Sequence, residues 1–311
     1  MNVIEVHNLV KRYRNATANA IDGVSFDVRD GQLISLLGPN GAGKTTTISI
    51  LTTTLTLTSG YVRIAGIDLA NGAALIRRQI GIVFQGTSLD LNLTAEENIR
   101  LHAVLYGLYP WRPLYCLMPR AYRIQVGELA EVLGVGDILS RPAASLSGGT
   151  RRKFEIVRAL MHRPRVLFLD EPTAGLDPEA RRGLWAYLRA ARERYGTTVF
   201  LTTHYLEEAE TADSVCVLSN GRVIESGSPA DVKARHVHPE LVLDAADQDG
   251  LRRELLALGL AFDGTAPLRV RLDDRPAVDI LRSIRTDLTV LRVAEPTLEE
   301  SYLRMFEDPR R

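Results

Sequence analysis

The chain has 311 residues, a length typical of about two domains. Apolar residues make up 45% of it and charged residues 24%, as in a soluble protein with a full hydrophobic core. The formal net charge is zero, so no global electrostatic field favours nucleic acid or an anionic membrane as a partner.

Cysteine usage and the lack of long apolar runs bear on the compartment. The two cysteines, Cys116 and Cys216, are far apart in sequence, which argues against a disulfide framework or a zinc site and suits a reducing cytosol. The first residues lack the basic start and apolar run of a signal peptide. No apolar run approaches the roughly 20 residues that a membrane-spanning helix needs. We therefore expect neither a secretion signal nor a membrane span.

The N-terminal part reads as strands around a phosphate-binding loop. Residues 3–9 alternate apolar and polar side chains and predict an edge strand. Residues 38–46 read Gly-Pro-Asn-Gly-Ala-Gly-Lys-Thr-Thr, after the apolar strand 32–37, and fit the pattern G-x-x-x-x-G-K-[ST]. The glycines let successive N–H groups point at one anion, and a helix is expected to begin at about Gly43. A chance glycine-rich turn is the alternative, but the strand in front of the full pattern argues against it.

Four residues in or near this loop have individual candidate roles. Lys44 is placed to reach the β- and γ-phosphates of a nucleotide, and the Thr45 hydroxyl to ligate Mg²⁺. Tyr13 is placed either to stack on an adenine ring or to pack at a strand end, and its position before the loop favours stacking. Gln85 ends a buried strand, where ligands of α/β sheets gather, although a strand-end glutamine is often merely solvated.

The middle of the chain contains an irregular segment. Thr94 and Glu97 form a capping box that opens a helix running to about residue 106. Residues 106–122 then hold three prolines and five aromatic residues, so one continuous helix is excluded. The sequence leaves two interpretations open, a partner-facing surface and an irregular packed loop.

Two later motifs suggest further chemistry. Ser-Gly-Gly at 147–149 precedes a helix with a basic start, which predicts a second anion site, although a plain N-cap is the common alternative. The apolar strand 166–169 ends in Asp170 and Glu171. Asp170 is suited to holding Mg²⁺ and Glu171 to taking a proton from an attacking water, whereas a structural acidic turn is the alternative.

The remaining sequence adds two candidates and a second unit. Asp177 lies in a turn before a helix, and His204 follows the buried strand 197–203, where a lone histidine is more often structural than catalytic. From about residue 239 short strands and helices alternate in a small α+β pattern, without a recognisable chemical constellation.

Taken in order, these motifs resemble those of the ATP-binding subunits of ABC transporters over residues 3 to about 235. The resembling motifs are Walker A at 38–46, the Q-loop at Gln85, the signature at 146–150, Walker B with its glutamate at 166–171, the D-loop at Asp177, the switch histidine at His204 and the adenine-stacking aromatic at Tyr13. Within the family the chain is similar to single-domain subunits of the daunorubicin-resistance type, whose small C-terminal unit ends in a motif like 295–303.

Two positions depart from the family pattern. Thr150 stands where the signature more often has Gln, which leaves the contacts of Ser147 and Gly149 intact. The Pro- and aromatic-rich residues 109–123 differ from the usual charged helix, so the surface that meets a membrane partner is expected to be unusual.

The resemblance implies the fold class and the domain boundaries. The fold is an α/β P-loop NTPase core of the ABC ATPase type, with an antiparallel β subdomain and an inserted helical subdomain at about 86–163. The ATPase domain spans 1–236, and a C-terminal accessory α+β domain spans 237–311.

The resemblance also implies the ligands, ATP and Mg²⁺, and the residues that hold them. The catalytic residues are Glu171, His204 and Gln85, and the metal-binding residues are Thr45, Gln85 and Asp170. The implied nucleotide contacts are Tyr13, Gly38, Pro39, Asn40, Gly41, Ala42, Gly43, Lys44, Thr45, Thr46, Ser147, Gly148, Gly149 and Asp177.

The implied function is that of an ATP-hydrolysing subunit of a bacterial exporter for drugs, lipids or other hydrophobic or glycosylated compounds. It would lie at the cytoplasmic face of the membrane, as a head-to-tail dimer on a separate permease, with no nucleic acid partner. The alternative is a permease-independent ABC ATPase acting on DNA or the ribosome, but those usually carry coiled-coil insertions or tandem ATPase units. A phosphate-loop kinase or GTPase would leave Ser147–Gly149 and His204 unexplained.

Overall fold

The computed structural model describes residues 1–132, 134–272 and 275–307. The chain divides into two compact units, Met1–Ser226 and Gly227–Arg311. The predicted boundary at residue 236 falls later than this division, at the end of helix α8 (Pro229–His236). The last four residues of the predicted C-terminal domain, 308–311, lie outside the described residues.

A six-stranded sheet forms the centre of the first unit, with strand order β10-β9-β3-β8-β7-β6. Strands β9, β3, β8, β7 and β6 pair in parallel. The bounds are β3 Leu33–Leu37, β6 Ile80–Val83, β7 Val166–Asp170, β8 Thr198–Thr203, β9 Ser214–Ser219 and β10 Arg222–Gly227. Every residue of β3, β7 and β8 is buried, as expected for parallel strands covered on both faces.

A second, antiparallel sheet has the order β2-β1-β4-β5. Its strands are β1 Asn2–Lys11, β2 Ile21–Arg29, β4 Ser59–Ile64 and β5 Ile67–Asp68. The prediction that residues 3–9 form an edge strand is wrong, because β1 pairs with β2 on one side and with β4 on the other. Alternating hydrophobicity reports that one face is buried, and it carries no information on how many neighbours the strand has.

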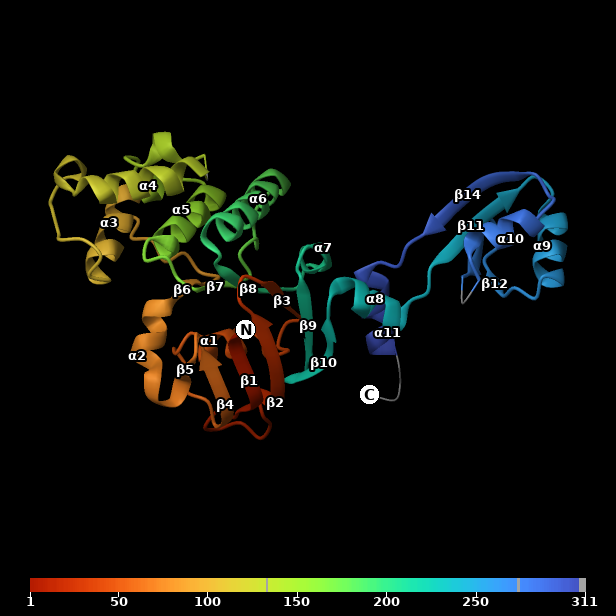
Figure 1. Cartoon of the computed structure of the whole chain (residues 1–311), viewed down its shortest axis with the longest axis horizontal. Coiled ribbons are helices and arrows are strands. Elements are labelled where there is room, and N and C mark those ends of the chain that lie inside the picture. Colours follow the sequence, from red (N-terminus) through yellow and green to blue (C-terminus); the bar gives the residue numbers. More distant parts are fainter. Residues whose placement is uncertain (133, 273–274, 308–311) are drawn as a thin grey trace. The chain divides into compact units, whose positions relative to one another are not determined.

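Helix α1 (Lys44–Leu51) connects the two sheets, because its Ile48 and Ile50 lie in one apolar core with Ile4 of β1 and Phe168 of β7. The other helices of this unit are α2 Leu69–Gln79, α3 Ala95–Leu105, α4 Arg120–Val132, α5 Gly148–Leu160, α6 Pro178–Tyr195 and α7 Leu206–Glu210. Figure 1 shows α4, α5 and α6 above the band of central strands and the antiparallel strands below it. The expected fold class, an ABC-type α/β core with antiparallel β and helical subdomains, is confirmed.

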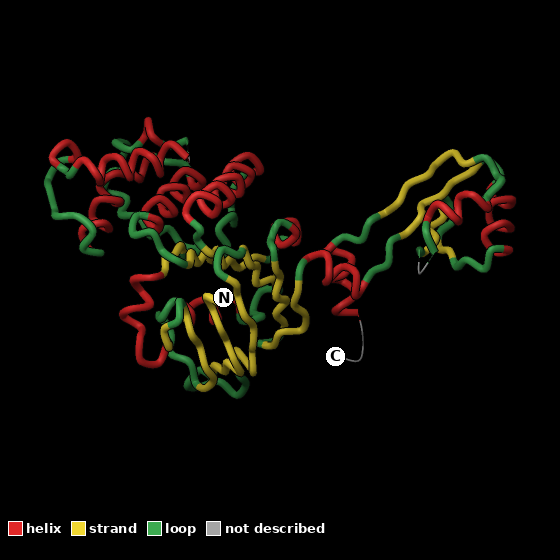
Figure 2. The backbone as a smooth tube through the Cα atoms, in the orientation of Figure 1, coloured by secondary structure: helices red, strands yellow, loops and turns green. Residues whose placement is uncertain are grey.

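The irregular segment predicted after α3 is present. The Thr94–Glu97 capping box opens α3 as expected. Between residues 106 and 119 the only helical stretch is a 3₁₀ turn, Tyr115–Leu117. Figure 2 shows this connection as a long green loop at the left-hand margin.

The second unit is a small α+β domain, as predicted. Its sheet has the order β12-β13-β11-β14, with β11 Glu240–Ala245, β12 Phe262–Asp263, β13 Leu268–Arg271 and β14 Leu288–Ala294. Helices α9 (Gln248–Ala257) and α10 (Ala277–Ser283) share its apolar core, and α8 packs on α11 (Leu298–Glu307). Among the described residues of both units, no helix is long and apolar enough to cross a membrane.

Candidate nucleotide site

Strand register places three of the predicted motifs together. Strand β8 lies between β3 and β7, with Leu37 opposite Thr203 and Asp170 opposite Thr202. The phosphate loop follows β3, Glu171 follows β7 and His204 follows β8, so all three emerge at the carboxyl edge of neighbouring parallel strands. The sequence separations of these motifs exceed 30 residues, and the sheet alone makes them neighbours.

Close backbone packing explains two glycines of the loop. Gly43, the N-cap of α1, has φ of 109°, and a Cβ there would lie 2.6 Å from Ile21 Cδ1. A Cβ on Gly38 would lie 2.4 Å from the carbonyl oxygen of Leu218. No side chain caps this end of α1, so its first N–H groups stay available for an anion.

A cavity of about 390 Å³ lies over the loop, lined by loop residues together with Ala20, Gln85 and Glu171. Lys44 is buried, and its Nζ donates to the carbonyl oxygens of Gly38 (2.8 Å) and Pro39 (3.2 Å). The same Nζ lies 3.5 Å from Glu171 Oε1. The only ammonium group among the described residues lining this cavity is therefore already paired with the predicted base.

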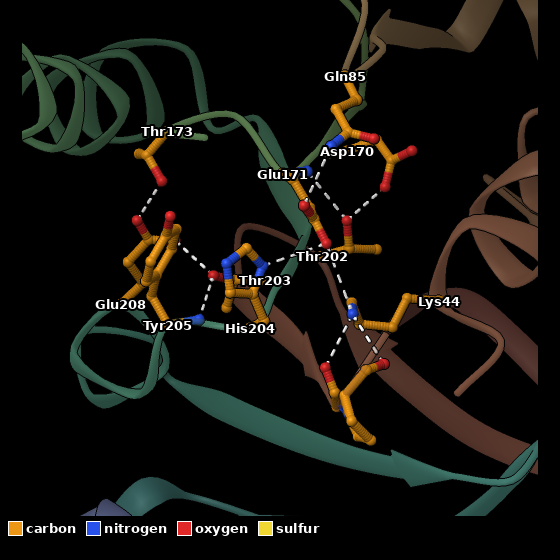
Figure 3. A network of polar contacts seen from close by, with 12 residues as sticks. Lys44, Gln85, Asp170, Glu171, Thr173, Thr202, Thr203, His204, Tyr205 and Glu208 are labelled. Carbon is orange, nitrogen blue, oxygen red and sulfur yellow. Dashed lines mark hydrogen bonds and ion pairs between the residues drawn. The ribbon is translucent and has the colours of Figure 1, made fainter. Parts of the chain in front are cut away.

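The Glu171 carboxylate is the centre of the polar network in Figure 3. Gln85 Nε2 donates to Oε2 at 3.3 Å, and His204 Nδ1 lies 3.4 Å from Oε1. The backbone N–H of Glu171 donates to Thr202, to its carbonyl oxygen at 3.2 Å and its hydroxyl at 3.0 Å. The three predicted catalytic residues thus meet at one carboxylate.

Asp170 is set apart from Glu171 by its burial. It is 2% exposed, and Thr202 Oγ1 donates to its carboxylate at 2.5 Å. Burial raises the pKa of Asp170, while hydrogen bonds from Thr202 and Thr45 and the charge of Lys44 oppose the shift. Oxygen donors from Thr45, Asp170 and Gln85 fit Mg²⁺, which prefers a few protein oxygens and shares the rest with phosphate and water.

Tyr13 lies beside the loop, since its hydroxyl is 3.2 Å from Thr46 Oγ1. Tyr13 is 45% exposed, and Lys11 Nζ lies 5.5 Å from the centroid of its ring. An exposed face next to the loop is compatible with adenine stacking, which stays a prediction.

The signature and D-loop residues occupy other helix ends. Ser147 is the N-cap of α5, accepting from the Thr150 N–H, and its hydroxyl lies 2.8 Å from Thr150 Oγ1. Asp177 is the N-cap of α6 and accepts from the Ala180 N–H at 2.8 Å. Among the described residues that line the loop cavity, neither these caps nor Gly148–Gly149 occur. The signature and D-loop residues therefore lie apart from the phosphate loop of their own chain.

Comparison with known proteins identifies the family. The family profile described as ABC transporter matches residues 21–174. The daunorubicin/doxorubicin resistance ATP-binding protein DrrA of Streptomyces peucetius is 38% identical, over 98% of this chain and 93% of its own length. The chain belongs to the ABC transporter ATP-binding subunits of the daunorubicin-resistance type.

Two further comparisons concern a relative that is matched over part of its length and a solved structure. The probable multidrug ABC transporter ATP-binding protein YbhF of Escherichia coli is 37% identical over 76% of this chain, but the match spans only 39% of that relative. The ATP-binding cassette MJ0796, in a dimeric post-hydrolysis state bound to ADP and Pi, has 27% identity and a TM-score of 0.64 and covers 72% of this chain and 98% of that one. As an ABC ATP-binding subunit, the chain is an ATPase that binds adenine nucleotide.

The ABC subunit also contains residues of structural importance that the motifs did not reveal. Arg152 is 7% exposed and donates to the carbonyl oxygens of Phe84 (2.5 Å) and Gln85 (2.9 Å). It also pairs with Glu155 at 2.9 Å, and Glu155 accepts from the Ser88 N–H at 2.6 Å. The signature helix α5 therefore holds the backbone around Gln85. Its basic start was visible in the sequence, but its partner, more than 60 residues away, was not.

A second unpredicted group supports the end of β8. Glu208 is 2% exposed and accepts from Thr203 Oγ1 at 2.6 Å and from the Thr173 hydroxyl (Figure 3). Thr203 in turn accepts from the Tyr205 N–H at 2.9 Å, so the chain on both sides of His204 is fixed. Only the Thr-Thr-His sequence at 202–204 hinted at this arrangement.

Proposed function

We propose that this ATPase is the motor subunit of a bacterial exporter and works at the cytoplasmic face of the membrane. It acts as a head-to-tail dimer on a separate permease that carries drugs, lipids or other hydrophobic or glycosylated compounds. The names of its relatives support the export class, since they are described as drug-resistance and multidrug ATP-binding proteins.

The observation that carries the proposal is the set of contacts around Glu171 at the mouth of the phosphate-loop cavity. Its carboxylate lies 3.5 Å from Lys44 Nζ, 3.3 Å from Gln85 Nε2 and 3.4 Å from His204 Nδ1. An arriving triphosphate competes for the Lys44 ammonium, because its charge and its several oxygens exceed those of one carboxylate. Binding of ATP therefore frees Glu171 for a water molecule.

The chemistry then follows from the positions of this chain's residues. Lys44 and the N–H groups at the start of α1 stabilise the phosphates, and Glu171 accepts the proton of the water that attacks the γ-phosphate. Gln85 and His204 orient that carboxylate from two sides. Thr45, Asp170 and Gln85 would hold Mg²⁺, which supplies charge neutralisation at the β- and γ-phosphates.

The dimer completes each site in the proposal. Ser147–Gly149 and Asp177 stand at helix N-termini outside the cavity of their own chain, as expected of groups that serve the nucleotide of a partner. The dimeric, ADP- and Pi-bound state of MJ0796 gives a precedent in the same fold. Residues 86–123, next to Gln85, are the proposed contact with the permease.

A complementation experiment tests the composite site. Ser147→Arg and Glu171→Gln are each expected to lower the hydrolysis rate at least about 100-fold on their own. In a mixture, a heterodimer has one intact site, made from Glu171 of the first variant and Ser147 of the second, so activity should return. The matched control mixes Ser147→Arg with the double variant, which offers no intact site. If the first mixture is as inactive as this control, the head-to-tail dimer is refuted.

A further inference from the structure

The α3–α4 segment, residues 101–124, exposes an unusual amount of apolar surface. Of the twenty large apolar side chains that are exposed among the described residues, nine lie in this segment. Leu105 is 76% exposed, Trp111 59% and Leu114 57%. Isolated exposed apolar residues are ordinary, but a cluster of this density marks a binding surface.

The charge of the region is as uneven as its hydrophobicity. From residue 98 to residue 127 the sequence contains four arginines and no aspartate or glutamate, although the whole chain has zero net charge. Arg100 is buried and pairs with Glu96 and Glu97. Arg112, Arg120 and Arg123 are exposed, and in the described part of the chain their guanidinium groups form no ion pair. The apolar cluster is therefore accompanied by unneutralised positive charge.

Buried and packed tyrosines hold the segment in place. Tyr122 is fully buried, and its hydroxyl donates to Glu96 at 2.8 Å. The rings of Tyr109 and Tyr115 pack edge-on against it, and Tyr109 donates to Gln125 at 2.8 Å. In Figure 1 the yellow loop between α3 and α4 lies at the left-hand margin, away from the labelled strands of the central sheet. Trp111 and Leu114 are thus exposed on a segment that the packed tyrosines fix in place.

We propose that the α3–α4 segment binds the surface of a bilayer containing anionic lipids. Apolar side chains together with Trp, Tyr and Arg suit the interface between acyl chains and headgroups. Unpaired arginines gain from negative phosphates there, whereas a protein surface would need matching carboxylates. Because the segment lacks regular hydrogen-bonded structure between residues 106 and 114, it belongs at headgroup depth, where water satisfies the backbone. Residues 101–123 also belong to the region proposed above as the permease contact. The lipid contact replaces that assignment for these residues and leaves residues 86–100, next to Gln85, to the permease. Lipid binding by the segment requires neither ATP nor a permease.

The first test is flotation of the full chain with protein-free vesicles. Phosphatidylcholine vesicles containing phosphatidylglycerol should bind the protein, and pure phosphatidylcholine vesicles should bind it far less. Each arginine near an anionic surface contributes about a fivefold factor, so the variant R112Q/R120Q/R123Q should bind about 100-fold more weakly. The matched control, R29Q/R78Q/R182Q, removes three exposed arginines elsewhere in the same unit and should bind as the wild type does.

A fluorescence test locates the contact. The chain has two tryptophans, Trp111 and the 7% exposed Trp185, so Trp185→Phe leaves Trp111 as the single reporter. Its emission should shift to the blue with anionic vesicles and be quenched by brominated acyl chains. The change Leu114→Ser should weaken binding, whereas Leu75→Ser, at a similarly exposed leucine of α2, should not.

Three results would overturn the lipid contact. These are no flotation with anionic vesicles, flotation that the triple arginine variant does not weaken, and binding that occurs only when vesicles contain the permease. The last would assign the segment to a protein partner. None of them bears on the proposed motor function, which is read separately from ATP hydrolysis by the soluble chain.

Discussion

The nucleotide site and the α3–α4 segment differ in whether their charged groups are paired and in how much apolar surface they expose. At the nucleotide site the charged groups have polar partners, and the Glu171 carboxylate lies within 3.5 Å of Lys44, Gln85 and His204. In the α3–α4 segment Arg112, Arg120 and Arg123 form no ion pair with any carboxylate of the described residues, and leucines and a tryptophan face solvent. The first region suits a small, multiply charged anion such as a nucleotide. The second has the properties of a region that contacts an extended surface.

The largest effect is expected at the centre of the first region. Glu171→Gln keeps the shape of the side chain but cannot readily accept a proton, so hydrolysis should slow by about 10²–10⁴-fold. ATP should stay bound, because the variant removes a negative charge near the γ-phosphate, and the ATP-bound dimer should persist. Single-turnover hydrolysis and size-exclusion chromatography measure both. Glu131→Gln, at an exposed position of α4, is the control. Wild-type turnover in the Glu171 variant would move the base elsewhere, first to His204.

A large loss of stability is expected where the network reaches helix α5. Arg152→Ala leaves Glu155 buried and without its cation, and breaking a buried ion pair costs about 3–5 kcal/mol. The backbone at Phe84 and Gln85 also loses its donors. Urea unfolding measures the change. Replacing both partners, as in R152M/E155L, should recover part of the loss, and a full loss in the double variant would contradict this account.

Asp170 should show a conflict between stability and metal binding. Burial raises its pKa in the folded state, so its stabilising contribution is present below the unfolded value and is lost as pH rises through the folded pKa. Asp170→Asn should therefore raise the Tm of the nucleotide-free protein at pH 7. It should not raise the Tm at a pH below the pKa that the Asp170 carboxyl has in the unfolded chain. The same variant should lose Mg²⁺-dependent hydrolysis. A lowered Tm at pH 7 would show that the ionised carboxylate stabilises the fold.

The smallest effect is expected in the second region. Trp111→Ser with Leu114→Ser changes two exposed side chains that lie outside the nucleotide network, so unfolding free energy should change by less than about 0.5 kcal/mol. Hydrolysis by the purified chain without vesicles should be unchanged. Urea unfolding and a steady-state ATPase assay check this. A large loss in either would show that the segment is a packed loop and would remove the contrast between the two regions.

The sequence predicted the features that local spacing encodes. A strand, a glycine-rich loop and a helix must follow one another at 32–51, and Asp170–Glu171 must follow an apolar strand, so these were readable. Spacing contains no information on partners distant in sequence, such as Arg152 with Phe84 or Glu155 with Ser88. For the same reason the neighbours of β1 were assigned wrongly. The α3–α4 segment stayed ambiguous because exposure, which separates a surface from a packed loop, is a property of the folded chain.

The backbone of Glu171 has one more consequence. Its φ is 44°, in the left-handed region, where a residue with a Cβ is disfavoured by about 1–2 kcal/mol relative to ordinary conformations. The two bonds from its N–H to Thr202 hold it there and aim the carboxylate at the cavity. Glycine would adopt this conformation without strain. Laboratory evolution of this chain for thermal stability alone should therefore select glycine at position 171. The resulting protein would be more stable and would no longer hydrolyse ATP.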